Sequence, residues 1–220
     1  MRLVLASASP RRADLLRAAG YAFDTLAVDL DERVHPGEAP AAYVARLARE
    51  KSAAAMERLL DGGPERPAPR GQVTGWPAPA PIVGRPFQGR QLEDVAILGA
   101  DTTVVVDGAI LGKPEDDRDA AAMLHKLSDR AHEVLTGVSL RTSSGEWGRV
   151  ESTRVYMTAL SPQDVAWYVA SGEGRDKAGG YAAQGLASRF ISRIEGSYSN
   201  VVGLPVATVE ALLREAAPAR

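Results

Sequence analysis

The feature that most constrains the fold is the run VAILGADTTVVV at residues 95–106. This run is almost wholly apolar and rich in β-branched residues, which is typical of a strand in the middle of a sheet. Asp107 and Gly108 follow it and favour a hairpin turn into a short strand at 109–111. We therefore expect the chain to fold around one long central strand.

Helices and strands alternate along the rest of the chain. Further strands are expected at 3–6, 23–28, 131–142, 148–158 and 189–194, and helices at 10–19, 41–60, 117–127, 162–170 and 205–216. Interleaved strands and helices, with hairpins in the second half, predict an α/β fold with a mixed sheet.

Composition excludes several classes of protein. The net charge of −2 gives no general basic field for nucleic acid or an anionic membrane. The chain has no cysteine, which excludes disulfides and thiolate catalysis, and no apolar run approaches the length of a membrane span. The apolar run at the N-terminus is too short for a signal peptide. A length of 220 residues suits one domain, and we expect it to be soluble and cytoplasmic.

Residues 61–94 differ from the rest of the chain. They contain half of its 14 prolines and few aliphatic residues. This composition favours a flexible or extended insertion rather than a folded unit.

Asp101 interrupts the apolar run of the central strand. A carboxylate in a buried strand loses much of its hydration unless a cation or several donors compensate. Beside a cleft, such a group can hold a divalent metal or take a proton from water. The alternative is an aspartate that accepts backbone N–H bonds at a β-bulge.

Two arginines stand where a helix normally carries acidic residues. Ser9 and Pro10 predict a helix start, and Arg11 and Arg12 then lie at the positive end of its dipole. Backbone N–H groups at a helix start bind anions, and arginine adds bidentate donors for phosphate oxygens. A bound polyanion would explain both arginines. The alternative is that they point into solvent or pair with Asp14 and Asp31.

Two lysines and one loop are further candidates. Lys51 lies on the apolar stripe of the expected helix 41–60, and Lys113 directly follows a strand. Either lysine could bind phosphate, or its ammonium could simply be solvated. In the glycine-rich segment 172–185, Tyr181 and Gln184 could shape a pocket for a flat polar ring, although an ordinary surface loop has the same composition.

Common catalytic motifs are absent. The chain has no GxxxxGK[ST], GxGxxG, HExxH or GxSxG pattern, and its three histidines are scattered. Oxygen ligands with Mg²⁺ or Mn²⁺ therefore fit this chain better than a zinc site.

Eight segments in this order resemble the Maf family of nucleoside triphosphate pyrophosphatases. They are ASASPRR at 6–12, DLDE at 29–32, AREKSAAA at 48–55, GADTTVVVDG at 99–108, LGKPED at 111–116, HEVLTGV at 132–138, DKAGGYAAQG at 176–185 and GSYSNVVGLP at 196–205. The resemblance implies a twisted mixed sheet in two lobes around a central cleft, spanning residues 1–220, and commonly a homodimer. It also implies cleavage of a nucleotide between its α and β phosphates with a divalent cation.

The resemblance also implies roles for particular residues. Asp101 would be the general base that activates water and would also contact the metal, with Glu32 as a further metal ligand. Ser7, Arg11, Arg12, Lys51 and Lys113 would cradle the triphosphate. Arg11, Thr102 and Gln184 match positions tied to substrate choice, in a combination similar to the branch that acts on dTTP and UTP. Such an enzyme would limit incorporation of non-standard nucleotides.

Two other functions remain open at this point. One is the same chemistry on 7-methyl-GTP, against which Gln184 argues. The other is a nucleotide-binding protein without turnover that inhibits septum formation. Residues 61–94 depart from the short connection usual in the family and would act as a tether, a partner-binding segment or a lid.

Overall fold

The computed structural model describes residues 1–61 and 94–217, so the expected insertion at 61–94 lies almost wholly outside the described residues. The elements in chain order are β1 (Arg2–Ala6), α1 (Pro10–Ala18), β2 (Phe23–Thr25), α2 (Pro40–Leu60), β3 (Val95–Val106), β4 (Ala109–Leu111), α3 (Asp117–Leu127), β5 (Ala131–Thr142), β6 (Gly145–Met157), α4 (Pro162–Ala170), η2 (Ala178–Gly180), η3 (Leu186–Phe190), β7 (Ile191–Glu195), α5 (Tyr198–Val202) and α6 (Val206–Ala216).

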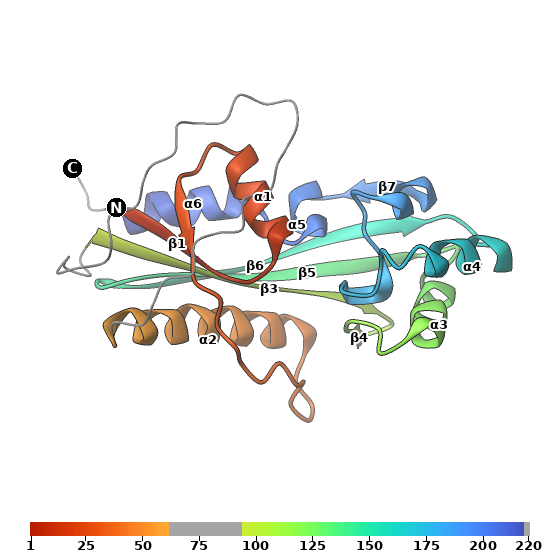
Figure 1. Ribbon diagram of the computed structural model, residues 1–220, viewed down its shortest axis with the longest axis horizontal. Helices are drawn as coiled ribbons and strands as arrows, with labels where there is room; N and C mark the ends of the chain where they lie inside the picture. The colour runs from red at the N-terminus through yellow and green to blue at the C-terminus, as the bar shows by residue number, and fades with distance from the viewer. Residues whose placement is uncertain (62–93, 218–220) are drawn as a thin grey trace.

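One mixed sheet organises the molecule. Its strand order is β2-β1-β3-β5-β6-β7, and β4 pairs with β3 off this path. Strand β1 is parallel to both of its neighbours, whereas the other pairs are antiparallel. The long strands β3, β5 and β6 run through the length of the molecule (Figure 1). The expected mixed-sheet α/β fold is confirmed.

Helices cover the two halves of the sheet differently. In one half, α2 lies on one face and α1 and α6 lie on the other, while α3 and α4 lie beside the opposite half (Figure 1). Successive residues of a strand point to opposite faces of the sheet, so β3 contributes apolar side chains to both faces. Leu98 belongs to the same core cluster as Leu16 and Leu212, whereas its neighbour Ile97 belongs to the cluster of Leu59. The sheet is continuous through both halves, so the expected cleft between two lobes stays a prediction.

Two glycines bring α2 against the sheet. A Cβ on Gly99 would lie 2.1 Å from the carbonyl oxygen of Ala48, and one on Gly137 would lie 2.1 Å from that of Val44. Only residues without a side chain allow the helix backbone this close to β3 and β5. The close approach sets how far side chains of α2 reach over the sheet.

Strand β3 has a gap along one of its edges. Strand β1 pairs with it as far as Gly99, and β4 pairs with it from Val104. Residues 100–103 therefore have no strand partner on this edge among the described residues, although β5 pairs with them on the other edge. The loops that follow β1 and β4 lie at the two ends of this gap. In α/β proteins, ligands commonly bind at the carboxyl ends of parallel strands, and the carboxyl end of β1 lies at this gap.

The structure corrects four details of the expected elements. Strand β2 covers Phe23–Thr25 rather than 23–28, because its pairing with β1 ends at Thr25. Strand β6 begins at Gly145 rather than at 148, because Thr142 and Gly145 already pair across a two-residue loop. Strand β7 covers Ile191–Glu195 rather than 189–194, because residues 189 and 190 belong to the short helix η3. The five-residue α5 was not expected, since it is shorter than two helical turns and shows no apolar period.

Candidate active site

An ammonium bridges two carboxylates at the gap of β3. Lys51 Nζ lies 2.6 Å from Asp101 Oδ1 and 2.6 Å from Glu32 Oε1. Lys51 and Asp101 are each 7% exposed, whereas the Glu32 side chain is about half exposed. Among the described residues, Asp101 Oδ2 accepts no hydrogen bond. The three side chains leave one carboxylate oxygen of Asp101 available at the edge of the buried cluster.

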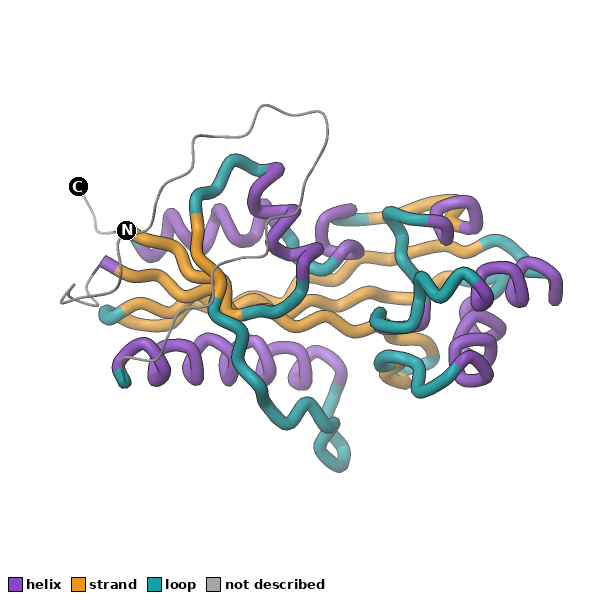
Figure 2. The backbone as a smooth tube through the Cα atoms, in the orientation of Figure 1, coloured by secondary structure: helices purple, strands orange, loops and turns teal. Residues whose placement is uncertain are grey.

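The positions of these three residues follow from α2 and its contacts. Lys51 shares the buried stripe of α2 with Val44 and Leu47, so its side chain points at the sheet. The loop between β2 and α2 crosses to the start of that helix (Figure 2), and Tyr43 of α2 donates a hydrogen bond of 2.9 Å to the Glu32 carbonyl. Arg46 also donates to the Arg33 carbonyl over 3.1 Å. These bonds hold Glu32 beside Lys51.

Electrostatics in this cluster favour the ionised form of Glu32. Burial by itself would raise the pKa of Glu32, but the hydrogen bond and charge of Lys51 outweigh it and lower that pKa, with help from Lys113 and Arg12. Burial, followed by the charges of Asp101 and Glu32, raises the pKa of Tyr43 to about 12. Glu32 is therefore ionised near neutral pH, and Tyr43 remains a hydrogen-bond donor.

A buried arginine lies on the opposite face of β3. Arg12 is 9% exposed and donates from Nε to the Gly203 carbonyl over 2.8 Å, with further bonds to Ser7 Oγ at 3.2 Å and Thr102 Oγ1 at 3.1 Å. All three acceptors are neutral, and no carboxylate of the described residues lies within 4.0 Å of Arg12. Burial lowers the pKa of Arg12, and the charge of Asp101 opposes part of that shift. A buried cation without a counter-ion at contact distance is a candidate for an anionic ligand.

Arg11 has a different environment. Its guanidinium lies 3.3 Å from Asp176 Oδ2, and Lys177 contacts the other oxygen of the same carboxylate. The alternative in which the arginines pair with Asp14 and Asp31 is wrong, because those carboxylates pair with Arg17 and Arg33. Arg12 instead contacts Ser7 and Thr102, and Arg11 contacts Asp176.

The start of α1 offers unused donors. Ser9 is the N-cap residue and Pro10 follows it, as expected, but the Ser9 side chain makes no capping bond and the first turn has no acidic residue. The side chain of Ser7 accepts from Ser9 N at 3.2 Å as well as from Arg12. The helix start thus keeps its positive dipole end uncovered by acidic groups, which suits an anion.

Lys113 and Gln184 are two predicted site residues whose side chains make no described contact with this cluster. Both are exposed, and neither makes a hydrogen bond within the described part of the chain. Lys113 follows β4 at the far end of the gap and is close enough to lower the pKa of Glu32. The Gly179 N–H donates to the Gly112 carbonyl over 2.9 Å, which ties the segment leading to Gln184 to this loop. No described contact links Gln184 itself to Asp101.

The bulge alternative for Asp101 is wrong. Residues 97–105 of β3 pair with 141–133 of β5 in unbroken register, with Asp101 opposite Gly137 and Thr102 opposite Thr136. The lysine ammonium, and not a set of backbone donors, compensates the buried carboxylate.

The donor set is compatible with a magnesium-like ion. Among the described residues there is no group of three His, Cys, Asp or Glu that could hold a metal. Glu32 and Asp101 nevertheless present two carboxylates that converge on the Lys51 ammonium. Mg²⁺ commonly binds through one or two carboxylates and takes its other ligands from phosphates and water. The residues fit an ion that arrives with a triphosphate.

Several residues around Arg12 were not predicted from the sequence. Thr136, Asn200 and Gly203 form its surroundings, and Tyr43 holds the Glu32 loop. A threonine in a strand, an asparagine in a short helix and a glycine after it are common residues. The signal available was their place in two of the resembling segments, HEVLTGV for Thr136 and GSYSNVVGLP for Asn200 and Gly203.

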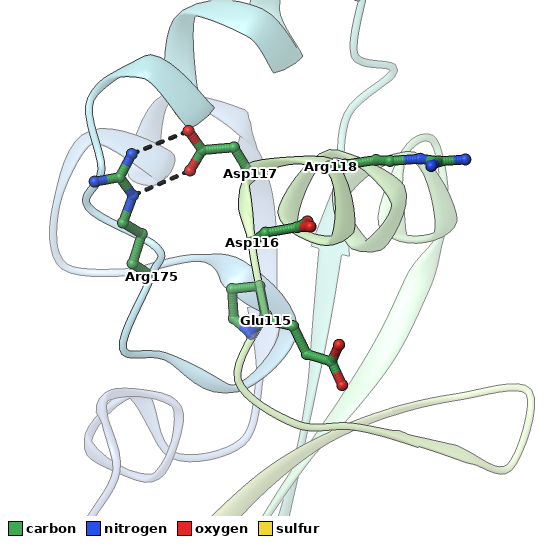
Figure 3. Close-up of a pocket in the computed structure, with 6 residues that line it drawn as sticks. Glu115, Asp116, Asp117, Arg118 and Arg175 are labelled. Atoms are coloured by element: carbon green, nitrogen blue, oxygen red, sulfur yellow. Dashed lines mark hydrogen bonds and ion pairs between the residues drawn. The ribbon is translucent and has the colours of Figure 1, made fainter.

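A hollow of about 560 Å³ lies elsewhere, beside the start of α3 (Figure 3). Glu115, Asp116, Asp117, Arg118 and Arg175 line it, and Arg175 forms a two-bond ion pair with Asp117. All of its charged groups are exposed and its acidic groups outnumber its basic ones. We therefore place the candidate functional site at the gap of β3, where Arg12 is buried with only neutral acceptors.

The fold and this site define a class of protein: an α/β protein with a candidate polyanion site, in which buried cations lie beside a carboxylate pair. The family described as Maf-like protein matches residues 2–216, and this chain belongs to that family. In the part of the chain that the structure describes, no helix is long and apolar enough to cross a membrane.

Relatives of similar length support the assignment. A dTTP/UTP pyrophosphatase of Anaeromyxobacter sp. (strain Fw109-5) is 44% identical over 220 residues, covering 98% of this chain and 89% of the relative. A dTTP/UTP pyrophosphatase of Hahella chejuensis is also 44% identical, with 97% and 92% covered. A third of that name, from Syntrophomonas wolfei, is 42% identical, with 95% and 94% covered.

Proposed function

We propose that this chain hydrolyses dTTP and UTP to the nucleoside monophosphate and pyrophosphate. The observation that carries the proposal is Arg12, a buried cation with only neutral acceptors, located across β3 from the Lys51–Asp101 pair. The names of three relatives at 42–44% identity agree with this activity. A triphosphate carries enough negative charge to compensate the four candidate cations, Arg11, Arg12, Lys51 and Lys113.

Asp101 would act as the general base. Its Oδ2 would take a proton from a water molecule whose oxygen attacks the α-phosphorus. The bond from that phosphorus to the α–β bridging oxygen breaks, and the electron pair leaves with pyrophosphate. Positioning and charge neutralisation supply most of the rate enhancement in reactions of this type.

The remaining predicted residues would neutralise and orient the substrate. Ser7, Arg11, Arg12, Lys51 and Lys113 would contact phosphate oxygens, and arginine geometry favours bidentate contacts. Arg11 and Lys177 would exchange their shared contact with Asp176 for the substrate. Glu32 and Asp101 would hold Mg²⁺ or Mn²⁺. When bound, that ion supplies charge stabilisation at the phosphates.

Selection of the base would involve Arg11, Thr102 and Gln184. The hydroxyl of Thr102 is engaged with Arg12, Gly203 and Thr136, so its influence would pass through Arg12 rather than through a direct bond to the base. A homodimer that works in the cytoplasm, and a link to septum formation, complete the proposal.

A substrate panel in ¹⁸O-labelled water tests the proposal. Purified protein with Mg²⁺ or Mn²⁺ should convert dTTP and UTP at the highest kcat/KM, release pyrophosphate and place the label in the monophosphate. Preference for 7-methyl-GTP would overturn the substrate assignment. Tight nucleotide binding with no product after long incubation would support the non-catalytic alternative instead.

A further inference from the structure

A buried hydrogen-bond network lies between Arg12 and the interior of the molecule. We propose that Thr136 of β5 is a positioning residue that fixes the Arg12 guanidinium through Thr102. The effect of this positioning role on turnover rests on the proposed function, whereas its effect on anion binding does not. Thr136 and Asn200 are both fully buried, so neither can touch a substrate that enters from solvent.

The contacts form a continuous path. Arg12 donates to Thr102 Oγ1 over 3.1 Å, and Thr102 Oγ1 lies 2.9 Å from Thr136 Oγ1. Thr136 Oγ1 in turn lies 3.4 Å from the Asn200 carbonyl oxygen. The Gly203 carbonyl completes the enclosure, because it accepts from Arg12 Nε at 2.8 Å and lies 3.2 Å from Thr102 Oγ1.

The direction of the bonds follows from counting protons. Arginine has donors only, so the Thr102 oxygen must accept from Arg12. The single proton of Thr102 then goes to Thr136 or to the Gly203 carbonyl. In the first case the Thr136 proton goes to the Asn200 carbonyl, and in the second it is free to go to either neighbour. In both arrangements the Thr136 hydroxyl limits which way the Thr102 hydroxyl can turn.

Asn200 anchors the inner end of this path. Its Nδ2 donates to the Val134 carbonyl and to Thr153 Oγ1, each over 3.0 Å. These bonds fasten α5 to β5 and β6, so the backbone carbonyls of residues 200 and 203 have fixed positions. Gly203 has a φ of 129°, which a residue with a side chain rarely adopts. The sheet itself therefore holds the groups that orient Arg12.

The consequence is a preorganised cation. Three of the five N–H donors of Arg12 are used by neutral acceptors, which leaves two donors in a fixed direction for an anion. A guanidinium that is already immobilised loses little further side-chain entropy when it binds phosphate. Loss of the Thr136 hydroxyl should loosen Arg12 and weaken anion binding without removing any group that contacts the ligand.

The test compares three variants of the full chain. Thr136→Val removes the hydroxyl at constant shape, and Thr136→Ser keeps it. Thr103→Val is the matched control, because Thr103 is a buried threonine of β3 whose hydroxyl has no hydrogen-bond partner in the described structure. Each protein is titrated with inorganic pyrophosphate by calorimetry, and kcat, KM and Tm are measured beside it.

We expect Thr136→Val to weaken pyrophosphate binding about tenfold and to raise the KM for dTTP by a similar factor, with a smaller change in kcat. Thr136→Ser should restore binding, and Thr103→Val should bind as the wild type does. Unchanged pyrophosphate affinity in folded Thr136→Val, or equal losses in Thr136→Val and Thr103→Val, would overturn the proposal. Pyrophosphate binding can be measured even if no nucleotide is turned over. Failure of the proposed function can therefore be told apart from failure of the positioning role of Thr136.

Discussion

Lys51 illustrates how a single residue joins stability to function. Its ammonium compensates a 7% exposed carboxylate that would otherwise be costly in the core, and it also holds Glu32 at the same point. The arrangement keeps one oxygen of Asp101 engaged and leaves the other for water. One cation and two carboxylates thus meet in the structure.

Replacement of Asp101 tests the base directly. Asp101→Asn keeps the shape and an acceptor oxygen for Lys51 but cannot take a proton, so kcat should fall on the order of 10²-fold or more. Steady-state rates with dTTP check this, and the Tm shows whether the variant is folded. Rates within a few-fold of the wild type would remove Asp101 from the role of general base.

Replacement of Arg12 separates binding from stability. The buried guanidinium has no carboxylate partner, so Arg12→Met should change the free energy of unfolding by less than about 1 kcal/mol. It should raise the KM for dTTP at least about tenfold. Denaturant melts and steady-state kinetics measure the two effects.

Arg46 provides the contrasting control for stability. Its guanidinium binds both oxygens of Glu38, at 2.7 and 2.8 Å, and lowers the pKa of Glu38 to about 2. Arg46→Met should therefore lower the free energy of unfolding, and by more than Arg12→Met does. A larger loss in Arg12→Met than in Arg46→Met would contradict the idea that Arg12 is kept for a ligand.

At the scale of elements, the packing of α2 on β3 and β5 sets the reach of Lys51. Gly99→Ala or Gly137→Ala should push the helix away, because each new Cβ would lie 2.1 Å from a backbone oxygen. We expect a loss of about 1–3 kcal/mol in unfolding free energy and a fall in kcat as Lys51 leaves Asp101. Denaturant melts and initial rates provide the measurement.

Gly148 of β6 is the control for this pair. A Cβ there meets its nearest atom at 3.6 Å, which is ordinary contact, and its φ is not positive. Gly148→Ala should therefore be close to neutral in both assays. If all three alanine variants behave alike, close approach of α2 is not what the two glycines provide.

The sequence indicated most elements because their signals are local. The apolar run of β3, the Ser9-Pro10 start of α1 and the stripe of α2 each appear within one window. It could not indicate α5 or the start of β6, where tertiary contacts decide. The same holds for the site: Asp101 and Lys51 stand out as charges in apolar patterns. Thr136 lies in the HEVLTGV segment, but no local pattern indicates that its hydroxyl reaches Thr102 until its partner across the sheet is known.

At the scale of the whole molecule, the site draws on both faces of one sheet. Lys51 and Glu32 approach from the α2 side, and Arg12 approaches from the α1 side. Lys51 contacts Asp101 and Arg12 contacts Thr102, two adjacent residues of β3 that lie between its pairings with β1 and β4. The charge of Asp101 acts on Arg12 and that of Arg12 on Glu32, so the two groups form one electrostatic unit.

Stability of the whole molecule should depend on pH through His132. Burial lowers its pKa to about 4 from 6.5, and its Nε2 contacts the Tyr181 hydroxyl at 2.7 Å. Between pH 6.5 and about pH 4, His132 therefore binds more protons in the unfolded chain than in the folded protein. The free energy of unfolding should therefore fall by about 3 kcal/mol through His132 as the pH falls from 6.5 towards 4.

Denaturant melts across this pH range measure the effect. His132→Gln should flatten the slope of stability against pH between 6.5 and 4. His125→Gln should leave the slope unchanged, because His125 is exposed on α3. Equal slopes in the wild type and His132→Gln would contradict this assignment.

The most direct test of the central claim is a crystal structure of the Asp101→Asn variant with dTTP and Mg²⁺. The account predicts that the triphosphate lies across the gap of β3, with phosphate oxygens in contact with Arg12, Lys51 and Lys113. A triphosphate bound elsewhere, for example at the hollow beside Asp117 and Arg175, with Arg12 still contacting only neutral acceptors, would contradict it.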